Sequence, residues 1–317
     1  MERFEQLAAA LRQSCPALEL REHEPMARHT TFRIGGPVRL MALPRSEGEV
    51  LACLREAERA QVRLVVLGNG SNLLAADGEI PCFAVLLTGL DALERTGERE
   101  IWAGAGVSLA RLASFAAQEG LAGLEFAHGI PGTLGGGVLM NAGAYGGEMV
   151  QVVKEVAAAG RSGVETVPAE QCGFSYRRSA FSDGERVILG AKFHLEPDDP
   201  AAIRGRMDEL ARRRKEKQPL EYPSAGSMFK RPAGHFAAAL IEQCGLKGLT
   251  VGGAQVSEKH AGFVINRGGA TCADVLALVD QVKERVLQQT GVEVELDVRV
   301  LREGLDRWDF WWHGEEE

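Results

Sequence analysis

The sequence predicts a globular protein of mixed helices and strands, with room for two or three domains. The chain has 317 residues, of which 45% are hydrophobic and 25% charged, and its apolar residues recur at helical spacing in some segments and at strand spacing in others. This composition excludes a disordered chain and a coiled coil. The net charge of −8 argues against general affinity for nucleic acids or acidic membranes, so small-molecule chemistry is the default expectation.

A strand, a helix and a second strand are predicted in the N-terminal third. Residues 38–43 are extended and apolar, residues 46–61 have apolar positions at helical spacing, and residues 63–67 form another apolar run. Ser46 with Glu49 three residues later is typical of a capping box at the start of the helix. Together these segments predict a βαβ unit.

The middle of the chain continues this alternation of elements. We expect strands near residues 83–87, 101–103, 150–157 and 187–193, and an amphipathic helix over residues 109–118.

The last third opens with a basic helix over residues 204–218, which Pro219 ends. A solvated helix face is the commoner explanation of such a charge run, and the alternative is that one or two of its cations face an anionic substrate. Thr271 and Asp274 then begin an amphipathic helix. The alternation in residues 291–301 predicts a strand after it.

The cysteines and the two ends of the chain point to an intracellular protein without a metal site. The six cysteines are scattered and none has the C-x-x-C spacing of a zinc or redox pair, so we expect reduced, mostly packed thiols. The N-terminus lacks the pattern of a signal peptide and no apolar run reaches about 18 residues, so we expect a cytoplasmic protein. Trp308, Trp311 and Trp312 are expected to pin the C-terminal tail to a domain, with partner binding as the alternative.

The 38 glycines are clustered, and the clusters limit which nucleotide chemistry is possible. No G-x-x-x-x-G-K-[ST] loop occurs, which excludes a P-loop, and both G-x-G segments have a leucine where a Rossmann fingerprint requires its third glycine. Two segments remain, residues 68–72 directly after an apolar strand and residues 129–137. Glycine turns of this kind can align backbone N–H groups on a pyrophosphate, although a single such turn is more often only a turn.

Several motifs in order resemble the UDP-N-acetylenolpyruvoylglucosamine reductase family. The resemblance is carried by HTTFRIGGPVRL (29–40), LGNGSNLL (67–74) and GLEFAHGIPGTLGGGVLMNAGAYGGEM (123–149). It continues through FSYRRSAF, YPSAGSMFKRP, LIEQCGLKGLTVGGAQVSEKHAGFVIN and GVEVELDVRVL. The match covers roughly residues 25–301 and resembles the compact form of the family, without an extra insertion in the substrate domain.

The resemblance implies an α+β protein with a vanillyl-alcohol-oxidase-like FAD-binding fold. Two α+β subdomains, expected over residues 1–92 and 93–200, would hold FAD. A third α+β domain over residues 201–303 would bind substrate, and residues 304–317 would form the aromatic and acidic tail.

By the same resemblance, the cofactor is FAD, reduced by NADPH. The residues expected to bind it are Gly68, Asn69, Gly70, Ser71, Asn72, Gly129, Ile130, Gly132 and Thr133. Covalent members of the wider fold often attach flavin through a histidine in the first of these loops. Residues 68–72 contain none, so we expect non-covalent binding.

The implied reaction reduces the enolpyruvyl ether of a UDP-sugar to the lactyl ether of UDP-N-acetylmuramate, with hydride from FAD N5. Negative charge builds on the substrate carboxylate and the adjacent carbon must be protonated, so a cation and a proton donor are needed. Arg177 matches the family's catalytic arginine and Ser227 its proton-donating serine. The family's final-strand glutamate is replaced by Asp297, with Glu295, on the same face of the predicted strand, as the alternative carboxylate.

Four residues are expected to contact substrate. Lys217 matches a substrate-binding lysine, and Tyr176 and His260 lie in matching segments. Arg231 stands where the family usually has asparagine, so it is expected to bind the diphosphate instead.

The predicted function is therefore an NADPH-dependent flavoenzyme of peptidoglycan precursor synthesis, acting as a monomer on a small molecule without nucleic-acid or membrane partners. Two alternatives remain open. One is another FAD-dependent oxidoreductase of the same fold, and the other is a catalytically weak protein that binds FAD or a nucleotide sugar. The Asp297 and Arg231 departures favour the second alternative, whereas the retained arginine and serine argue against it.

Overall fold

A computed structural model describes residues 2–303 of the chain. The predictions for Trp308, Trp311 and Trp312 fall outside the described residues.

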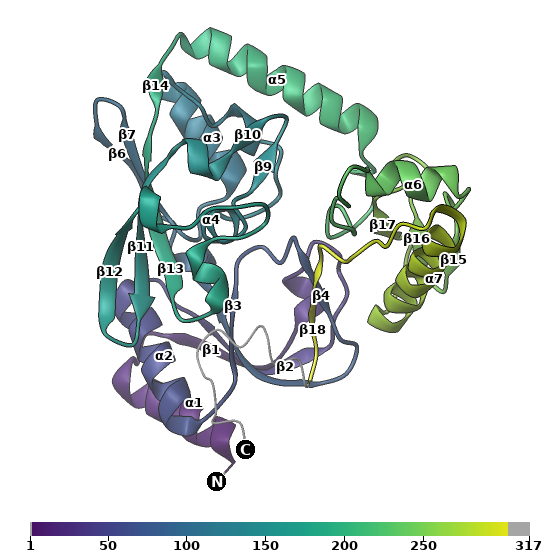
Figure 1. The fold of residues 1–317 in the computed structure, drawn as a ribbon. Helices are drawn as coiled ribbons and strands as arrows, with labels where there is room; N and C mark the ends of the chain where they lie inside the picture. The colour runs from purple at the N-terminus through teal and green to yellow at the C-terminus, as the bar shows by residue number, and fades with distance from the viewer. Residues whose placement is uncertain (1, 304–317) are drawn as a thin grey trace.

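The first sheet has the order β1-β2-β5-β3 and contains the predicted βαβ unit (Figure 1). Its strands are β1 (Glu19–Pro25), β2 (Pro37–Leu43), β3 (Leu64–Leu67) and β5 (Ile80–Leu86), packed with helices α1 (Arg3–Ser14) and α2 (Glu47–Ala60). Strands β2 and β3 both pair parallel with β5, as a strand–helix–strand connection requires. The Ser46 hydroxyl accepts the Glu49 N–H at 3.3 Å, whereas the Glu49 carboxylate accepts the N–H of Arg45, so only half of the predicted capping box forms as expected.

The second sheet has the order β12-β11-β13-β7-β6 and is antiparallel throughout. Its strands are β6 (Leu93–Gly97), β7 (Glu100–Gly104), β11 (Val153–Gly160), β12 (Gly163–Pro168) and β13 (Val187–His194). Helices α3 (Leu109–Gln118) and α4 (Leu134–Leu139) belong to the same part of the chain, with the short strand pairs β8 (Leu121–Ala122) with β14 (Glu196–Pro197) and β9 (Gly143–Ala144) with β10 (Gly147–Glu148). The strand predicted from residue 150 begins only at Val153, because Met149–Gln151 form a 3-10 turn.

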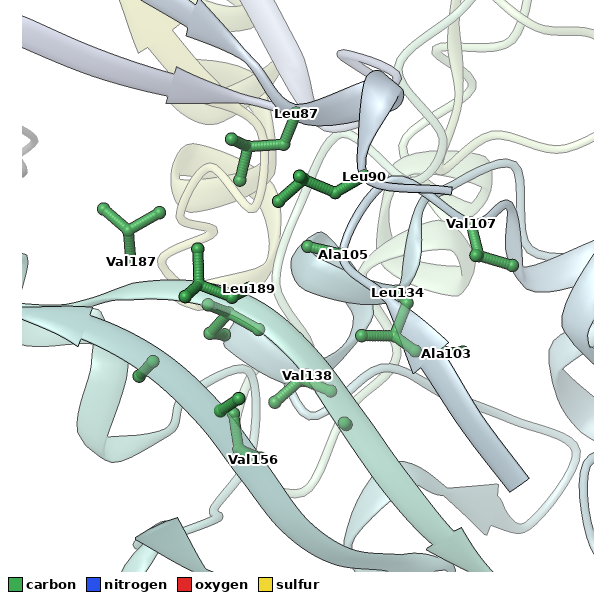
Figure 2. Close-up of a cluster of buried hydrophobic side chains, with 14 of the residues drawn as sticks. Leu87, Leu90, Ala103, Ala105, Val107, Leu134, Val138, Val156, Val187 and Leu189 are labelled. Carbon is green, nitrogen blue, oxygen red and sulfur yellow. The ribbon is translucent and has the colours of Figure 1, made fainter. Parts of the chain in front are cut away.

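A single apolar core joins these two sheets. Figure 2 shows Leu87 and Leu90, which follow the first sheet, facing Leu189 of β13 and Leu134 and Val138 of α4. All of these side chains are at most 8% exposed. The shared core fixes the two sheets as one body, so the loops that leave them are held in a defined relation.

The third part of the chain has a core of its own. It contains α6 (Ala237–Gln243), α7 (Cys272–Thr290) and a three-stranded sheet of β15 (Thr250–Val251), β16 (Ala254–Val256) and β17 (Val264–Asn266). The Thr271–Asp274 capping box forms at the start of α7, as predicted. The long basic helix α5 (Pro200–Lys217) spans the distance to this part from the second sheet (Figure 1).

The strand predicted over residues 291–301 is mostly wrong. Only β18 (Arg299–Leu301) is a strand, and it pairs parallel with β4 (Leu73–Ala75), so the chain returns to the first sheet's part of the molecule. Residues 292–298 make single contacts with another segment instead, because the Lys230 N–H donates to Glu295 O and Phe229 bridges to Leu296. The alternation of apolar residues in this segment therefore reflects burial of one side of an extended chain. It does not reflect a continuous ladder of strand hydrogen bonds.

Two further findings concern the thiols and the helices. All six cysteines are free and four of them are buried, which confirms the prediction of reduced, mostly packed thiols. Within residues 2–303, no helix combines the length and the apolar character needed to cross a membrane.

Candidate active site

The two glycine segments that the sequence singles out line one cavity of about 250 Å³. Residues 68–72 connect β3 to β4, and residues 129–133 lead into α4. The cavity wall contains eight of the nine residues expected to bind cofactor: Gly68, Asn69, Gly70, Ser71, Asn72, Ile130, Gly132 and Thr133. The fold thus brings together two loops that lie about 60 residues apart in the chain.

Glycine is required in the first loop by close approaches to neighbouring chain segments. A Cβ atom on Gly68 would lie 2.2 Å from Thr133 Oγ1, so the two glycine segments touch each other there. Gly70 has φ +57°, and a Cβ on it would lie 2.1 Å from the carbonyl oxygen of His29. The backbone of this loop therefore forms the cavity wall directly.

Gly129, the ninth expected cofactor residue, lines a second cavity and makes room for an arginine. A Cβ on Gly129 would lie 2.6 Å from Nη1 of Arg214, a residue of α5. Arg214 Nε donates to Gln218 Oε1 at 2.9 Å, while its buried Nη1 has no hydrogen-bond partner among the described residues. Burial lowers the pKa of Arg214.

The second cavity, of about 680 Å³, lies between the loop around Gly129 and the third part of the chain. Lys217 and His260, two of the four expected substrate residues, are in its wall. It shares Arg177, Arg214 and Ser227 with the first cavity. The residues expected to react with substrate therefore stand where the two cavities meet.

Arg177 and Asp297 form an ion pair at this junction. Arg177 Nε donates to Asp297 Oδ2 at 3.1 Å, and the aspartate side chain is only 8% exposed. The other carboxylate oxygen, Oδ1, is buried without a hydrogen-bond partner among residues 2–303. Arg177 has φ +58° in a tight turn between Ser175 and Arg178, so the backbone there is held in a conformation that side chains rarely adopt.

Ser227 is brought beside Asp297 by backbone pairing. The Asp297 N–H donates to the carbonyl of Met228 at 3.0 Å, and Met228 in turn donates to Gly262. Gly226, with φ +77°, supplies the turn that precedes the serine. The segment around Ser227 is thereby held between two others, which fixes the backbone of this cavity-wall residue.

The structure separates the two candidate carboxylates. Glu295 is 67% exposed, pairs with Lys230 at 3.0 Å and lines neither cavity. Lys230 lowers the pKa of Glu295 through this contact. The expectation that Glu295 shares a face with Asp297 is wrong, because residues 292–298 do not form a strand with regular alternation.

Tyr176 and Arg231 lie in neither cavity wall. The Arg231 N–H donates to the Tyr176 hydroxyl at 3.3 Å, and the Arg231 guanidinium packs over the Phe236 ring at 4.0 Å. Tyr176 and Phe236 are 58% and 61% exposed. This group of side chains links the second and third parts of the chain at the surface.

His260 lines the second cavity, with one ring nitrogen engaged by the backbone. Its Nδ1 accepts the N–H of Gly262 at 3.1 Å, and its ring lies edge-on to Phe263. Burial lowers the pKa of His260, which favours the uncharged ring. Because Nδ1 is an acceptor, the proton lies on Nε2.

Two arginines of the site were missed by the sequence analysis as individual residues. Arg214 belongs to the basic helix, whose charge run did not reveal which cation faces inward. Arg299 lines the first cavity and its Nη2 donates to Met140 Sδ at 3.1 Å. Burial lowers the pKa of Arg299 to about 10, and the Asp297 carboxylate opposes this shift. The sequence signal that could have identified Arg299 is its position two residues after Asp297.

The residues of the first cavity fit FAD. Glycine backbone, apolar side chains such as Leu109 and Ile130, and the unpartnered Arg214 Nη1 line the same space. A buried cation without a carboxylate partner is complementary to a phosphate, and bare backbone allows close approach by a dinucleotide.

Comparison with known proteins gives consistent matches. Residues 218–301 match the family model of the UDP-N-acetylenolpyruvoylglucosamine reductase C-terminal domain, and residues 38–164 match an FAD binding domain. A UDP-N-acetylenolpyruvoylglucosamine reductase of Pediococcus pentosaceus is 45% identical over 289 residues, which cover 91% of this chain and 96% of that relative. One of Syntrophomonas wolfei is 46% identical, over 91% of this chain and 97% of the relative.

A solved structure agrees with these relatives. The crystal structure of UDP-N-acetylenolpyruvylglucosamine reductase from Thermus caldophilus is 34% identical and superposes with a TM-score of 0.76, covering 89% of this chain and 98% of that one. Together with the FAD binding domain match, this confirms the expected α+β class and FAD-binding fold.

Proposed function

Because the chain belongs to the UDP-N-acetylenolpyruvoylglucosamine reductase family, we propose that it reduces UDP-N-acetylenolpyruvoylglucosamine with FAD as cofactor and NADPH as donor, in peptidoglycan precursor synthesis. The observation that carries the proposal is the junction of the two cavities, where Arg177, Ser227 and the buried Asp297 carboxylate converge. A protein that only bound a nucleotide sugar would need neither a proton donor nor a cation there.

The cofactor would lie along the two glycine segments. The backbone of residues 68–72 and 129–133 and the guanidinium of Arg214 would hold its pyrophosphate. Bound FAD would supply the redox chemistry, a two-electron reduction of the enolpyruvyl double bond at the expense of NADPH.

Arg177 would bind the substrate carboxylate as its negative charge grows. Its planar guanidinium offers further N–H groups besides the Nε that Asp297 occupies, and these can bind a carboxylate in a bidentate manner. Asp297 thereby orients the guanidinium toward the cavity junction. A fixed cation at the site of developing charge stabilises the transition state without reorganisation.

Ser227 would deliver a proton from Oγ to the carbon next to the carboxylate. A hydroxyl is a weak acid, but the electron-rich carbon formed during the reduction is a strong base, so the transfer requires mainly close placement. The paired backbone on both sides of Ser227 supports such a placement.

The second cavity would take the nucleotide sugar. Lys217 and the Nε2–H of His260 would donate to diphosphate or sugar oxygens. Arg231 and Tyr176 would close over the substrate at the surface rather than bind it from within the cavity. The cytoplasmic location and the monomeric state stay predictions.

Three matched variants test the proposal by separating its two half-reactions. Ser227→Ala should keep NADPH-dependent bleaching of the flavin and slow its reoxidation by substrate by about 10²–10⁴-fold, because only the second half-reaction needs the proton. Asp297→Ala should impair the same half-reaction, and the exposed Glu295→Ala should not. Stopped-flow absorbance under anaerobic conditions measures both steps. Equal loss in both half-reactions of Ser227→Ala would contradict the proton-donor role.

A further inference from the structure

Asn72 is the last residue of the first glycine loop, and its polar groups bind the segment that contains Asp297. Its side-chain Nδ2 donates to the backbone carbonyl of Asp297 at 3.1 Å. Its own carbonyl accepts the N–H of Arg299 at 3.0 Å. Both contacts join residues that lie more than 220 positions apart in the chain. The amide of Asn72 is therefore engaged by protein, although Asn72 also borders the cofactor cavity.

The neighbours Leu296 and Val298 pack into the apolar core, but among residues 2–303 few hydrogen bonds hold Asp297 itself, and Asn72 supplies one of them. The others are the Met228 carbonyl, which accepts the Asp297 N–H, and Arg177, which donates to Oδ2. No ladder holds the residue, because β18 begins only at Arg299 and residues 292–298 make isolated contacts. Without the Asn72 amide, the Asp297 carbonyl loses the hydrogen bond that fixes the orientation of the following peptide group.

Placement of the backbone matters more for an aspartate than for a longer carboxylate. Asp297 has one rotatable bond fewer than glutamate, so its carboxylate position follows its backbone position closely. A shift of about 1 Å at a reacting group can lower a rate by about 10²-fold. The contact that fixes this backbone is thus expected to influence the rate.

We propose that Asn72 is a positioning residue that holds Asp297, and through it Arg177, in register with the cofactor loop. The inference rests on the proposed function and deepens it. Loop 68–72 forms part of the first cavity's wall, and the same loop, through Asn72, contacts the segment of the carboxylate that pairs with Arg177 where the two cavities meet. The same short segment would therefore position groups that are used in both half-reactions.

Two substitutions at Asn72 test this role kinetically. Asn72→Ala removes the amide, and Asn72→Asp keeps its shape but cannot donate to the Asp297 carbonyl. Because Asn72 also borders the cofactor cavity, both variants are assayed at saturating FAD and the two half-reactions are measured separately, so that any effect on reduction by NADPH is known for each. Both should be reoxidised by substrate about 10- to 100-fold more slowly. A merely structural loop residue would slow both half-reactions alike.

A double-mutant cycle identifies the residue through which Asn72 acts. In the Asp297→Ala background, Asn72→Ala should cause little further loss, because the group that it positions is already gone. Additive losses would overturn the proposal, as would wild-type reoxidation in both Asn72 variants. Asn69→Ala serves as the loop control, because the Asn69 amide approaches Pro131 O at 3.5 Å rather than the Asp297 segment, so its effect should add to that of Asp297→Ala.

Hydrogen exchange provides a readout that does not depend on the reaction. Amides of residues 295–301 should exchange faster in Asn72→Ala than in the wild type or in Asn69→Ala. Unchanged protection of this segment would overturn the positioning role even if the kinetics changed. Failure of substrate to reoxidise wild-type flavin would instead refute the proposed function, and the exchange result would still decide on Asn72.

Discussion

The third part of the chain meets the rest of the protein along two contact regions, here called seams, that are built differently. One of these seams joins the third part to the part of the chain that holds the first sheet. We call it the backbone seam, because strand β18 pairs there with β4 and the other hydrogen bonds across it also involve backbone groups. Thr31 Oγ1 donates to Ser224 O at 2.7 Å, and the Asp77 carboxylate accepts the N–H groups of Cys272 and Ala273 at 2.7 and 3.1 Å. Figure 1 shows β18 running back to β4 at this seam.

The side-chain seam, toward the second sheet's part, depends on individual side chains. Its contacts include the Arg177–Asp297 pair and the bond between the Tyr176 hydroxyl and the Arg231 N–H. The apolar core of the third part, by contrast, takes in Phe32, Ile34 and Leu74 from across the backbone seam. The difference teaches that backbone pairing and apolar packing anchor the third part to the first, while Arg177 and Asp297 meet where individual side chains make the contact.

Among changes at the two seams, we expect the largest effect on the rate from removing Arg177, which pairs with Asp297 in the side-chain seam. Arg177→Ala removes the cation for the substrate carboxylate and leaves the buried Asp297 charge without its partner. We expect reoxidation of reduced flavin by substrate to fall about 10²–10³-fold, as when one oxyanion-stabilising donor is lost. Reduction by NADPH should change little, and stopped-flow absorbance measures both rates. Arg177→Lys keeps a charge without the planar fork, so full rescue by lysine would contradict bidentate binding.

Breaking the backbone seam should affect stability rather than chemistry. Asp77→Ala removes the carboxylate that caps the first N–H groups of α7 from another part of the molecule. We expect a loss of about 1 kcal/mol in the free energy of unfolding, within the range for lost helix caps. Denaturant unfolding measures it.

The control for Asp77→Ala lies on the same helix. Asp280 is an exposed residue of α7, and Asp280→Ala should stay within about 0.5 kcal/mol of the wild type. Equal destabilisation by the two substitutions would show that Asp77 does not act as a cap across the seam.

We expect the smallest effect on substrate binding from the exposed contact of the side-chain seam, between Tyr176 and Arg231. Tyr176→Phe removes the acceptor of the Arg231 N–H, but both residues are exposed and water can replace the bond. The KM for substrate should rise by less than about fivefold, corresponding to about 1 kcal/mol or less, while flavin reduction stays unchanged. A KM rise above tenfold would mean that Tyr176 contributes more to substrate binding than one surface hydrogen bond.

The sequence alone predicted the parts of the site that depend on local conformation. The glycines of residues 68–72 were a usable signal because close contacts, such as that of Gly70 with the backbone carbonyl of His29, leave no room for a side chain. The helix stripe of α7 and its cap were predicted for the same reason, since spacing and capping are local.

What escaped prediction depends on contacts between distant segments. Asp297 and Glu295 look alike in an alternating pattern, and only the pairing with Met228 and Asn72 shows which one is buried. Arg214 of the basic helix reaches the cavities, as Lys217 does, because Gly129 leaves room for its guanidinium, and helix periodicity does not reveal this. Arg231 stacks on Phe236 outside the cavity, so a residue expected at the diphosphate lies at the surface.

The most direct test of the account is an anaerobic absorbance titration of the wild-type protein. The purified protein, loaded with FAD, is reduced with NADPH and then mixed with UDP-N-acetylenolpyruvoylglucosamine. The account predicts that the flavin band bleaches with NADPH and returns fully with the substrate. A flavin that bleaches but stays reduced after the substrate is added would contradict it.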